Sequence, residues 1–139
     1  MNKRKITTFV VTLGLACMLI LGTAPAASSY YATGYYAYYA GLYDAYSSYY
    51  FDAALDTGSS TYRYNSWYYA YLNRNYQYQS YYYAPSGSVK EDAAWDAYYY
   101  AYYQNLYAQY NYYGYSYDSY QGVYDRENDI DRDLTLLYD

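Results

Sequence analysis

Tyrosine recurs along this chain at the spacing of an α-helix. In residues 33–55 and 89–121 the intervals between tyrosines of one face are three and four residues, and alanine fills many of the positions between them. Residues 62–83 follow the pattern less regularly, because Asn75 interrupts the face. Although residues 111–120 alternate around Gly114 as a strand would, the longer periodicity predicts three helices, at 33–55, 62–83 and 89–121, the last kinked or frayed near Gly114.

Two short polar breaks separate these segments. The stretches "DTGSST" (56–61) and "APSGS" (84–88) hold residues that favour turns. Ser88 followed by Glu91 is the spacing of a capping box and predicts the start of the third helix. After the third segment, residues 125–139 are acidic and almost free of tyrosine, and we interpret them as a solvated, charged tail.

A twelve-residue motif recurs along the chain. "YYAYYAGLYDAY" (35–46) and "YYAYYQNLYAQY" (99–110) agree at eight of twelve positions, and "YYAYLNRNYQYQ" (68–79) is a looser copy. The copies begin 33 and then 31 residues apart, a period typical of one repeated supersecondary unit. A low-complexity, tyrosine-rich composition also produces partial matches by chance. We therefore interpret the first and third copies as a true repeat and leave the second open.

The N-terminus has the composition of a secretory signal peptide. Lys3, Arg4 and Lys5 make the start of the chain positive, residues 6–22 are an apolar run, and "APA" (24–26) is a small-x-small cleavage site, which predicts cleavage before Ala27. An uncleaved anchor is the alternative and is the only membrane contact that we expect. The chain is thus divided into a signal peptide (1–26), a tyrosine-rich helical repeat domain (27–124) and an acidic C-terminal tail (125–139).

Removal of the signal peptide changes the composition and the charge. It leaves 113 of the 139 residues and all 34 tyrosines, and it removes the single cysteine, so that no disulfide can form. The remaining residues include five basic and 13 acidic side chains, which gives a net charge of −8. Because affinity for nucleic acid depends on basic side chains, this charge argues against nucleic-acid binding.

These observations predict an all-α fold, a bundle or array of about three helices, with partial disorder left open. Aliphatic side chains are few, so we expect tyrosine rings to supply much of the buried surface and many others to point outward. Exposed aromatic surface on this scale implies a partner, an assembly or a cross-link. The window 97–117 carries no charge, which also favours self-association or a homo-oligomer.

The residues needed for common catalytic and cofactor sites are largely missing. Without histidine there is no ready general base near neutral pH and no Ser-His or Cys-His pair, so we do not expect an enzyme. Three carboxylates, Asp129, Asp131 and Asp133, have the spacing of calcium ligands but lack the glycine and the closing glutamate of a calcium loop. Asp96 beside Tyr99 and Tyr103 offers hard oxygen ligands for a ferric or cupric ion. Beyond these ions we expect no cofactor.

Phenol chemistry is the remaining possibility. A tyrosine can lose one electron and one proton, and two tyrosyl radicals can couple, while side chains three or four residues apart on a helix lie about 5–6 Å apart. The candidates for cross-linking or redox chemistry are Tyr35, Tyr39, Tyr46, Tyr99, Tyr103 and Tyr110. The oxidant would come from a partner oxidase.

The sequence therefore predicts an exported, non-enzymatic structural or assembly protein of the bacterial envelope or extracellular matrix, in the periplasm, on the cell surface or outside the cell, and cross-linked through tyrosine. Two alternatives stay open. One is a redox accessory protein with a tyrosine relay or tyrosinate metal site, and the other is a module that stacks aromatic rings on a glycan or polymer.

Overall fold

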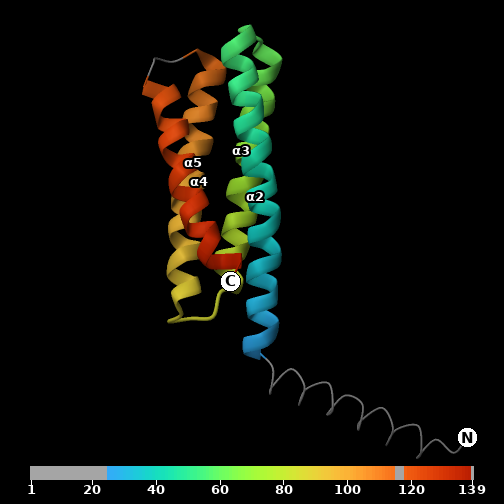
Figure 1. Ribbon diagram of the computed structural model, residues 1–139, viewed down its shortest axis with the longest axis vertical. Helices are drawn as coiled ribbons and strands as arrows, with labels where there is room; N and C mark the ends of the chain where they lie inside the picture. Colours follow the sequence, from blue (N-terminus) through green and yellow to red (C-terminus); the bar gives the residue numbers. More distant parts are fainter. Residues whose placement is uncertain (1–24, 115–117, 139) are drawn as a thin grey trace, which may run out of the picture.

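The computed structural model describes residues 25–114 and 118–138, which form four α-helices and no strand (Figure 1). The all-α prediction is confirmed for this part of the chain. The helices are α2 (Pro25–Thr57), α3 (Ser60–Tyr83), α4 (Val89–Tyr113) and α5 (Asp118–Tyr138). The predicted signal peptide lies outside the described residues except for Pro25 and Ala26, which begin α2.

The four helices form an up-down-up-down bundle (Figure 1). Short connections make successive helices antiparallel neighbours, so that α2 packs on α3, α3 on α4 and α4 on α5. Contacts between α5 and α2 close the bundle. Each of the four helices therefore has one inner face toward the bundle axis and one outer face toward solvent.

The predicted cap at the start of α4 is confirmed. The Ser88 hydroxyl accepts a hydrogen bond from the Glu91 backbone N–H at 3.1 Å. The Glu91 carboxylate in turn accepts one from the backbone N–H of Gly87, one residue earlier than in a standard capping box. Two N–H groups at this end of the helix are thus satisfied.

The predicted end of the third helix is wrong. Gly114 does not kink a helix that runs on to residue 121, because it has a φ of 80° and caps α4 in the left-handed conformation. The chain starts a fourth helix at Asp118, and most of the predicted acidic tail, 125–139, belongs to it. The strand-like stretch 111–120 is helical up to Tyr113 and from Asp118, and its residues 115–117 lie outside the described ones.

A seam of small and polar side chains, not of tyrosines, faces the bundle axis. Buried residues follow one another at intervals of four, three, four and three residues in each of three helices, the spacing of a coiled-coil seam. The seam comprises Thr33, Ala37, Ala40, Asp44 and Ser47 in α2, Ser66, Ala70, Asn73, Gln77 and Ser80 in α3, and Ala97, Ala101, Gln104, Ala108 and Asn111 in α4. These sets are offset by 33 and then 31 residues, so the second copy of the repeat, left open by the sequence, occupies the same register as the others.

The large apolar side chains of the core come mainly from α5. Ile130, Leu134 and Leu137 pack against alanines of α4 and against Ala37. A second cluster, nearer the other end, contains Phe51, Ala70, Ala108 and Val123. Tyrosine rings such as Tyr81, Tyr100 and Tyr107 pack around these clusters, but every tyrosine whose side chain is described is half-buried or exposed. Such positions leave the phenol hydroxyls within reach of water.

Candidate functional site

Three of the four helices carry equivalent rows of aromatic side chains on their outer faces. We call these rows the outer stripes: Tyr31, Tyr35, Tyr38, Leu42, Tyr46 and Tyr49 in α2; Tyr64, Tyr68, Tyr71, Asn75, Gln79 and Tyr82 in α3; Trp95, Tyr99, Tyr102, Leu106, Tyr110 and Tyr113 in α4. The equivalence extends to exposure, since Tyr35, Tyr68 and Tyr99 are 46%, 45% and 46% exposed. The repeat thus places equivalent aromatic rows on the outer faces of α2, α3 and α4.

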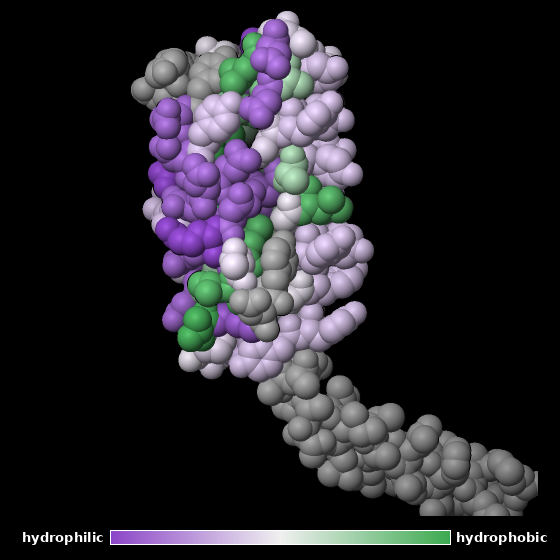
Figure 2. All heavy atoms as spheres, in the orientation of Figure 1, coloured by the Kyte–Doolittle hydropathy of each residue, from purple (hydrophilic) through white to green (hydrophobic). Residues whose placement is uncertain are grey.

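The outer face of α5 is charged instead. Arg126 and Arg132 both pair with Asp129 at 3.4 Å, and Arg132 also pairs with Asp133 at 3.2 Å. In Figure 2 the most hydrophilic side chains gather over α5, whereas the paler tyrosines cover the side formed by α2. The described bundle therefore has three aromatic faces and one charged face.

Four of the predicted tyrosine sites form two matching pairs. The ring centroids of Tyr35 and Tyr39 are 4.9 Å apart with planes at 59°, and those of Tyr99 and Tyr103 are 4.9 Å apart at 61°. The charge of Tyr39 and a hydrogen bond with it raise the pKa of Tyr35, and a hydrogen bond with Tyr99 raises the pKa of Tyr103. The second copy has Leu72 at the place of the second ring and so lacks this pair.

The other two predicted tyrosines contact different rings. Tyr46 lies 5.1 Å from Tyr69 of α3, and Tyr110 lies 6.4 Å from Tyr107 of its own helix. The structure thus places all six predicted residues in ring contacts, four of them in pairs with one another.

Six half-buried tyrosines between α2 and α3, together with the exposed Tyr31 and Tyr35, form a continuous row of rings. Following the chain of contacts, centroid distances are 6.4 Å (Tyr31–Tyr35), 4.9 Å (Tyr35–Tyr39), 5.9 Å (Tyr39–Tyr76), 5.1 Å (Tyr76–Tyr43), 6.2 Å (Tyr43–Tyr69), 5.6 Å (Tyr69–Tyr50) and 5.9 Å (Tyr50–Tyr62). We call these eight residues the α2–α3 ladder. Sequence spacing within one helix could not predict it, because the ladder crosses repeatedly between two helices.

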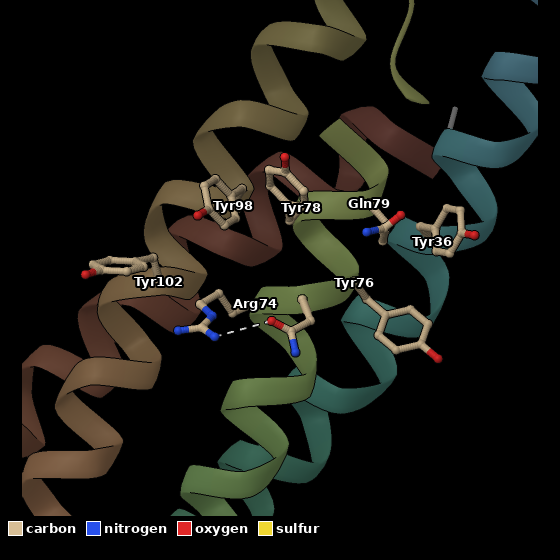
Figure 3. Close-up of a pocket in the computed structure, with 8 residues that line it drawn as sticks. Tyr36, Arg74, Tyr76, Tyr78, Gln79, Tyr98 and Tyr102 are labelled. Carbon is tan, nitrogen blue, oxygen red and sulfur yellow. Dashed lines mark hydrogen bonds between the residues drawn. The ribbon is translucent and has the colours of Figure 1, made fainter. Parts of the chain in front are cut away.

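An open groove of about 600 Å³ interrupts the outer stripe of α3 (Figure 3). It is lined by Arg74, by the amides of Asn75 and Gln79, and by the rings of Tyr36, Tyr76, Tyr78, Tyr98 and Tyr102. Arg74 donates hydrogen bonds of 3.3 Å to the side-chain oxygens of Asn75 and Asn105. The groove lies where the second copy of the repeat departs from the other two, which have leucine and tyrosine at the places of Asn75 and Gln79.

A buried polar layer lies in the core between the two apolar clusters. It was not predicted from the sequence. Asp44 Oδ1 accepts hydrogen bonds from Gln104 Nε2 at 2.6 Å and from Asn73 Nδ2 at 3.1 Å. Asn73 Nδ2 also donates to Gln104 Oε1 at 3.1 Å. The signal that could have found this layer is the seam of small residues, in which Asp44 follows Ala37 and Ala40 at intervals of three and four.

Burial raises the pKa of Asp44 to about 8, although the hydrogen bond from Gln104 acts in the opposite direction. The nearby carboxylates of Glu127 and Asp131 raise it further, and burial raises the pKa of each of these two as well. Asp44 is therefore largely protonated near neutral pH, so that the layer keeps its hydrogen bonds without a buried charge.

The predicted carboxylate ligands do not gather into a group of three in the described part of the chain. Across residues 25–114 and 118–138, no three carboxylate or thiol groups lie close enough together to hold an ion. Asp129 and Asp133 both form ion pairs with Arg132. Burial raises the pKa of Asp133, and the nearby charge of Asp96 raises it further. Burial raises the pKa of Asp131. The calcium, ferric and cupric ions stay predictions.

No protein family, curated protein or solved structure matches this chain. None of the helices in the described ranges combines the length and the apolar character needed to cross a membrane.

Proposed function

We propose that this chain is an exported, non-enzymatic structural protein of the bacterial envelope or extracellular matrix, whose copies assemble through the outer stripes and become joined by oxidative coupling of tyrosines. The observation that carries the proposal is the equivalence of the stripes on α2, α3 and α4. A partner oxidase would supply the oxidant. An interaction with nucleic acid has no part in the proposal.

The stripes have the properties of an assembly surface. A tyrosine ring brings a large apolar area, and contiguous exposed apolar patches beyond a few hundred Å² mark interaction sites in soluble proteins. Each stripe runs nearly the length of its helix with side chains at intervals of three or four residues. When two stripes pack together the rings lose contact with water, while the hydroxyl groups at the rim keep their hydrogen bonds.

The ends of the stripes are suited to covalent joining. Among the tyrosines whose side chains are described, Tyr31, Tyr49 and Tyr82 have the most exposed rings, at 76%, 65% and 68%. Coupling requires that a carbon next to the phenol oxygen of one ring meets the same carbon of a ring in another chain, which needs an accessible ring edge. Stripe packing brings such rings together, and an oxidant then makes the contact permanent.

The test compares two triple variants at the equivalent positions Tyr35, Tyr68 and Tyr99. We expect serine at all three to weaken self-association in sedimentation velocity, because an aromatic ring is lost from each stripe, whereas phenylalanine at all three preserves it. After treatment with a peroxidase and hydrogen peroxide, the parent chain should form dityrosine-linked oligomers. A parent chain that stays monomeric and unmodified at every concentration would contradict the proposal.

Export has its own test. We expect mass spectrometry of the chain produced in a bacterial host to find a mature protein that begins at Ala27, outside the cytoplasm. A chain that keeps residues 1–26 and fractionates with the membrane would favour the uncleaved anchor instead.

Glycan binding is a second candidate function, supported by the groove at Asn75 and Gln79. Aromatic rings on both sides suit the apolar faces of sugar rings, and the amides and Arg74 can bond hydroxyl or carboxylate groups. Isothermal titration with uronic-acid oligosaccharides tests it: binding should occur with the parent chain and be lost in Asn75→Leu/Gln79→Tyr, which fills the groove. No heat of binding in the parent would exclude these oligosaccharides as ligands.

A further inference from the structure

We propose that the α2–α3 ladder carries an oxidised state along the bundle, from Tyr62 near the α2–α3 turn to Tyr31 near the start of α2. The residue that meets the oxidant is then not the residue that becomes cross-linked. Only the final coupling between chains rests on the proposed function, since the transfer itself takes place within one chain.

The ladder is continuous in space. Each of its seven steps joins two rings whose centroids are between 4.9 and 6.4 Å apart. Residues 31–50 of α2 span about 28 Å at a rise of about 1.5 Å per residue. A direct transfer over that length would be slow, because electron transfer weakens steeply with distance, whereas seven short steps between chemically identical groups avoid the long one.

Phenol oxidation also requires that a proton moves with the electron. The rings of Tyr43 and Tyr76 have centroids 5.1 Å apart, and those of Tyr35 and Tyr39 are 4.9 Å apart. Burial raises the pKa of Tyr43, and Tyr76 raises it further. When one member of such a pair is a radical, the electron and the proton of the other can pass between the two oxygens. The alternation between α2 and α3 places the Tyr43–Tyr76 pair near the middle of the ladder and the Tyr35–Tyr39 pair near its end.

A one-electron oxidant of high potential, such as the ferryl haem of a peroxidase, takes one electron from Tyr62, whose proton goes to water. At each following step the radical gains an electron and a proton from the next tyrosine, which becomes the radical. Two Tyr31 radicals from two chains form one carbon–carbon bond, and the ring hydrogens at the joined carbons shift to the phenol oxygens. In total two electrons and two protons have left.

Exposure decides where the radical reacts. Tyr31 is 76% exposed, whereas the crossing residues Tyr69 and Tyr76 are half-buried. A radical on a half-buried ring meets another chain rarely and passes on, while one on Tyr31 is open to a second chain. Tyr38 and Tyr49 are side exits, 5.4 Å from Tyr39 and 5.2 Å from Tyr50.

The experiment oxidises one end of the ladder and detects the radical at the other. In a chain with Cys17→Ser, the exposed Thr61 is changed to cysteine and labelled with a ruthenium photo-oxidant, which is activated with persulfate in dilute, monomeric protein. A nitroso spin trap records the radicals, and peptide mass spectrometry gives the fraction of adduct at Tyr31. We expect substantial adduct at Tyr31 in this parent, and loss to the level of the unlabelled chain in Tyr69→Phe/Tyr76→Phe.

Matched variants separate the ladder from the general effect of removing phenols. Tyr64→Phe/Tyr71→Phe removes two hydroxyls from α3 outside the ladder and should leave the adduct at Tyr31 unchanged. Equal labelling of Tyr31 in the Tyr69→Phe/Tyr76→Phe variant and in the parent would overturn the proposal, as would an absence of adduct at Tyr31 in the parent. Circular dichroism confirms that each variant is folded. The spin trap detects the radical in monomers. The labelling of Tyr31 therefore does not depend on whether the chains assemble or become cross-linked.

Discussion

The ring of Tyr107 lies face-on against the backbone of Gly122, so close that a Cβ at position 122 would come within 2.6 Å of ring carbons Cγ and Cδ2. Tyr107 packs against the cluster that contains Phe51 and Val123. This contact sets how closely α4 and α5 approach at that end of the bundle. We expect Gly122→Ala to destabilise the fold by about 1–3 kcal/mol, the usual cost of overpacking, measured by urea denaturation.

Gly34→Ala is the matched control, because Gly34 also lies within a helix. A Cβ there would meet only the Leu137 carbonyl oxygen, at 3.9 Å. Alanine favours the helix over glycine by about 1 kcal/mol, so this variant should be as stable as the parent or more stable. Equal losses at both glycines would show that the Tyr107 contact is not the cause.

Replacement of Asp44 by asparagine should change how stability depends on pH. Because the pKa of Asp44 is about 8 in the folded chain and about 3.9 in the unfolded one, the folded state holds a proton between these values that the unfolded state has released. The stabilisation that this proton gives the folded state is fully present below about pH 4. As the pH rises toward 8, the free energy of unfolding falls by up to about 1.4 kcal/mol per pH unit. Asparagine keeps the acceptor for Asn73 and Gln104 but has no proton to lose.

The measurement is a series of urea denaturation curves at pH 4, 6 and 8. We expect Asp44→Asn to match the parent near pH 4 and to exceed it increasingly up to pH 8. Some dependence on pH should persist in the variant, because burial also raises the pKa of Glu127, Asp131 and Asp133. A parent chain that gains stability between pH 5 and 8 would contradict the burial of a protonated Asp44.

Larger side chains at the buried alanines of the seam should destabilise the bundle. Ala40 is fully buried on the inner face of α2, and leucine there should cost about 1–3 kcal/mol through overpacking. Ala45 lies on the same helix and is exposed, so Ala45→Leu should leave the free energy of unfolding nearly unchanged. Thermal unfolding of both variants checks this, and similar melting temperatures would show that α2 does not bury this face.

Completion of the interrupted stripe on α3 should strengthen self-association. Asn75→Leu/Gln79→Tyr gives the second copy the residues that the first and third copies have at these places. We expect a lower dissociation constant in sedimentation velocity, because more apolar surface is removed from water on contact. Asn75→Ala/Gln79→Ala removes the same amides without adding a ring, and an equal gain in that control would speak against a role for the stripe.

The sequence predicted the helices but did not indicate which side chains line the bundle axis. Tyrosine spacing correctly indicated helices at 33–55 and 62–83, because any face of a helix has the same period. It could not indicate which face points inward. In α4 the buried positions are filled by residues such as Ala101 and Gln104, which have little hydropathy to mark them. The tyrosines are conspicuous because they lie outside this seam.

The fourth helix was missed because its charge concealed its apolar face. Ile130, Leu134 and Leu137 recur at intervals of four and three, but carboxylates and arginines fill the positions between them. For the candidate site, the pairs within one helix followed from the repeat, as with Tyr99 and Tyr103. The ladder and the groove depend on which helices are neighbours, and a pattern along one helix does not contain that information.

The confinement of aromatic stripes to α2, α3 and α4 has a consequence for the material that such chains would form. A unit that binds through two faces can only extend a line, whereas a unit that binds through three can branch. Linked beyond a critical extent, branching units form a gel that spans its container. The charged outer face of α5, with its exposed Arg132, would then border the water-filled spaces of that gel and keep it swollen.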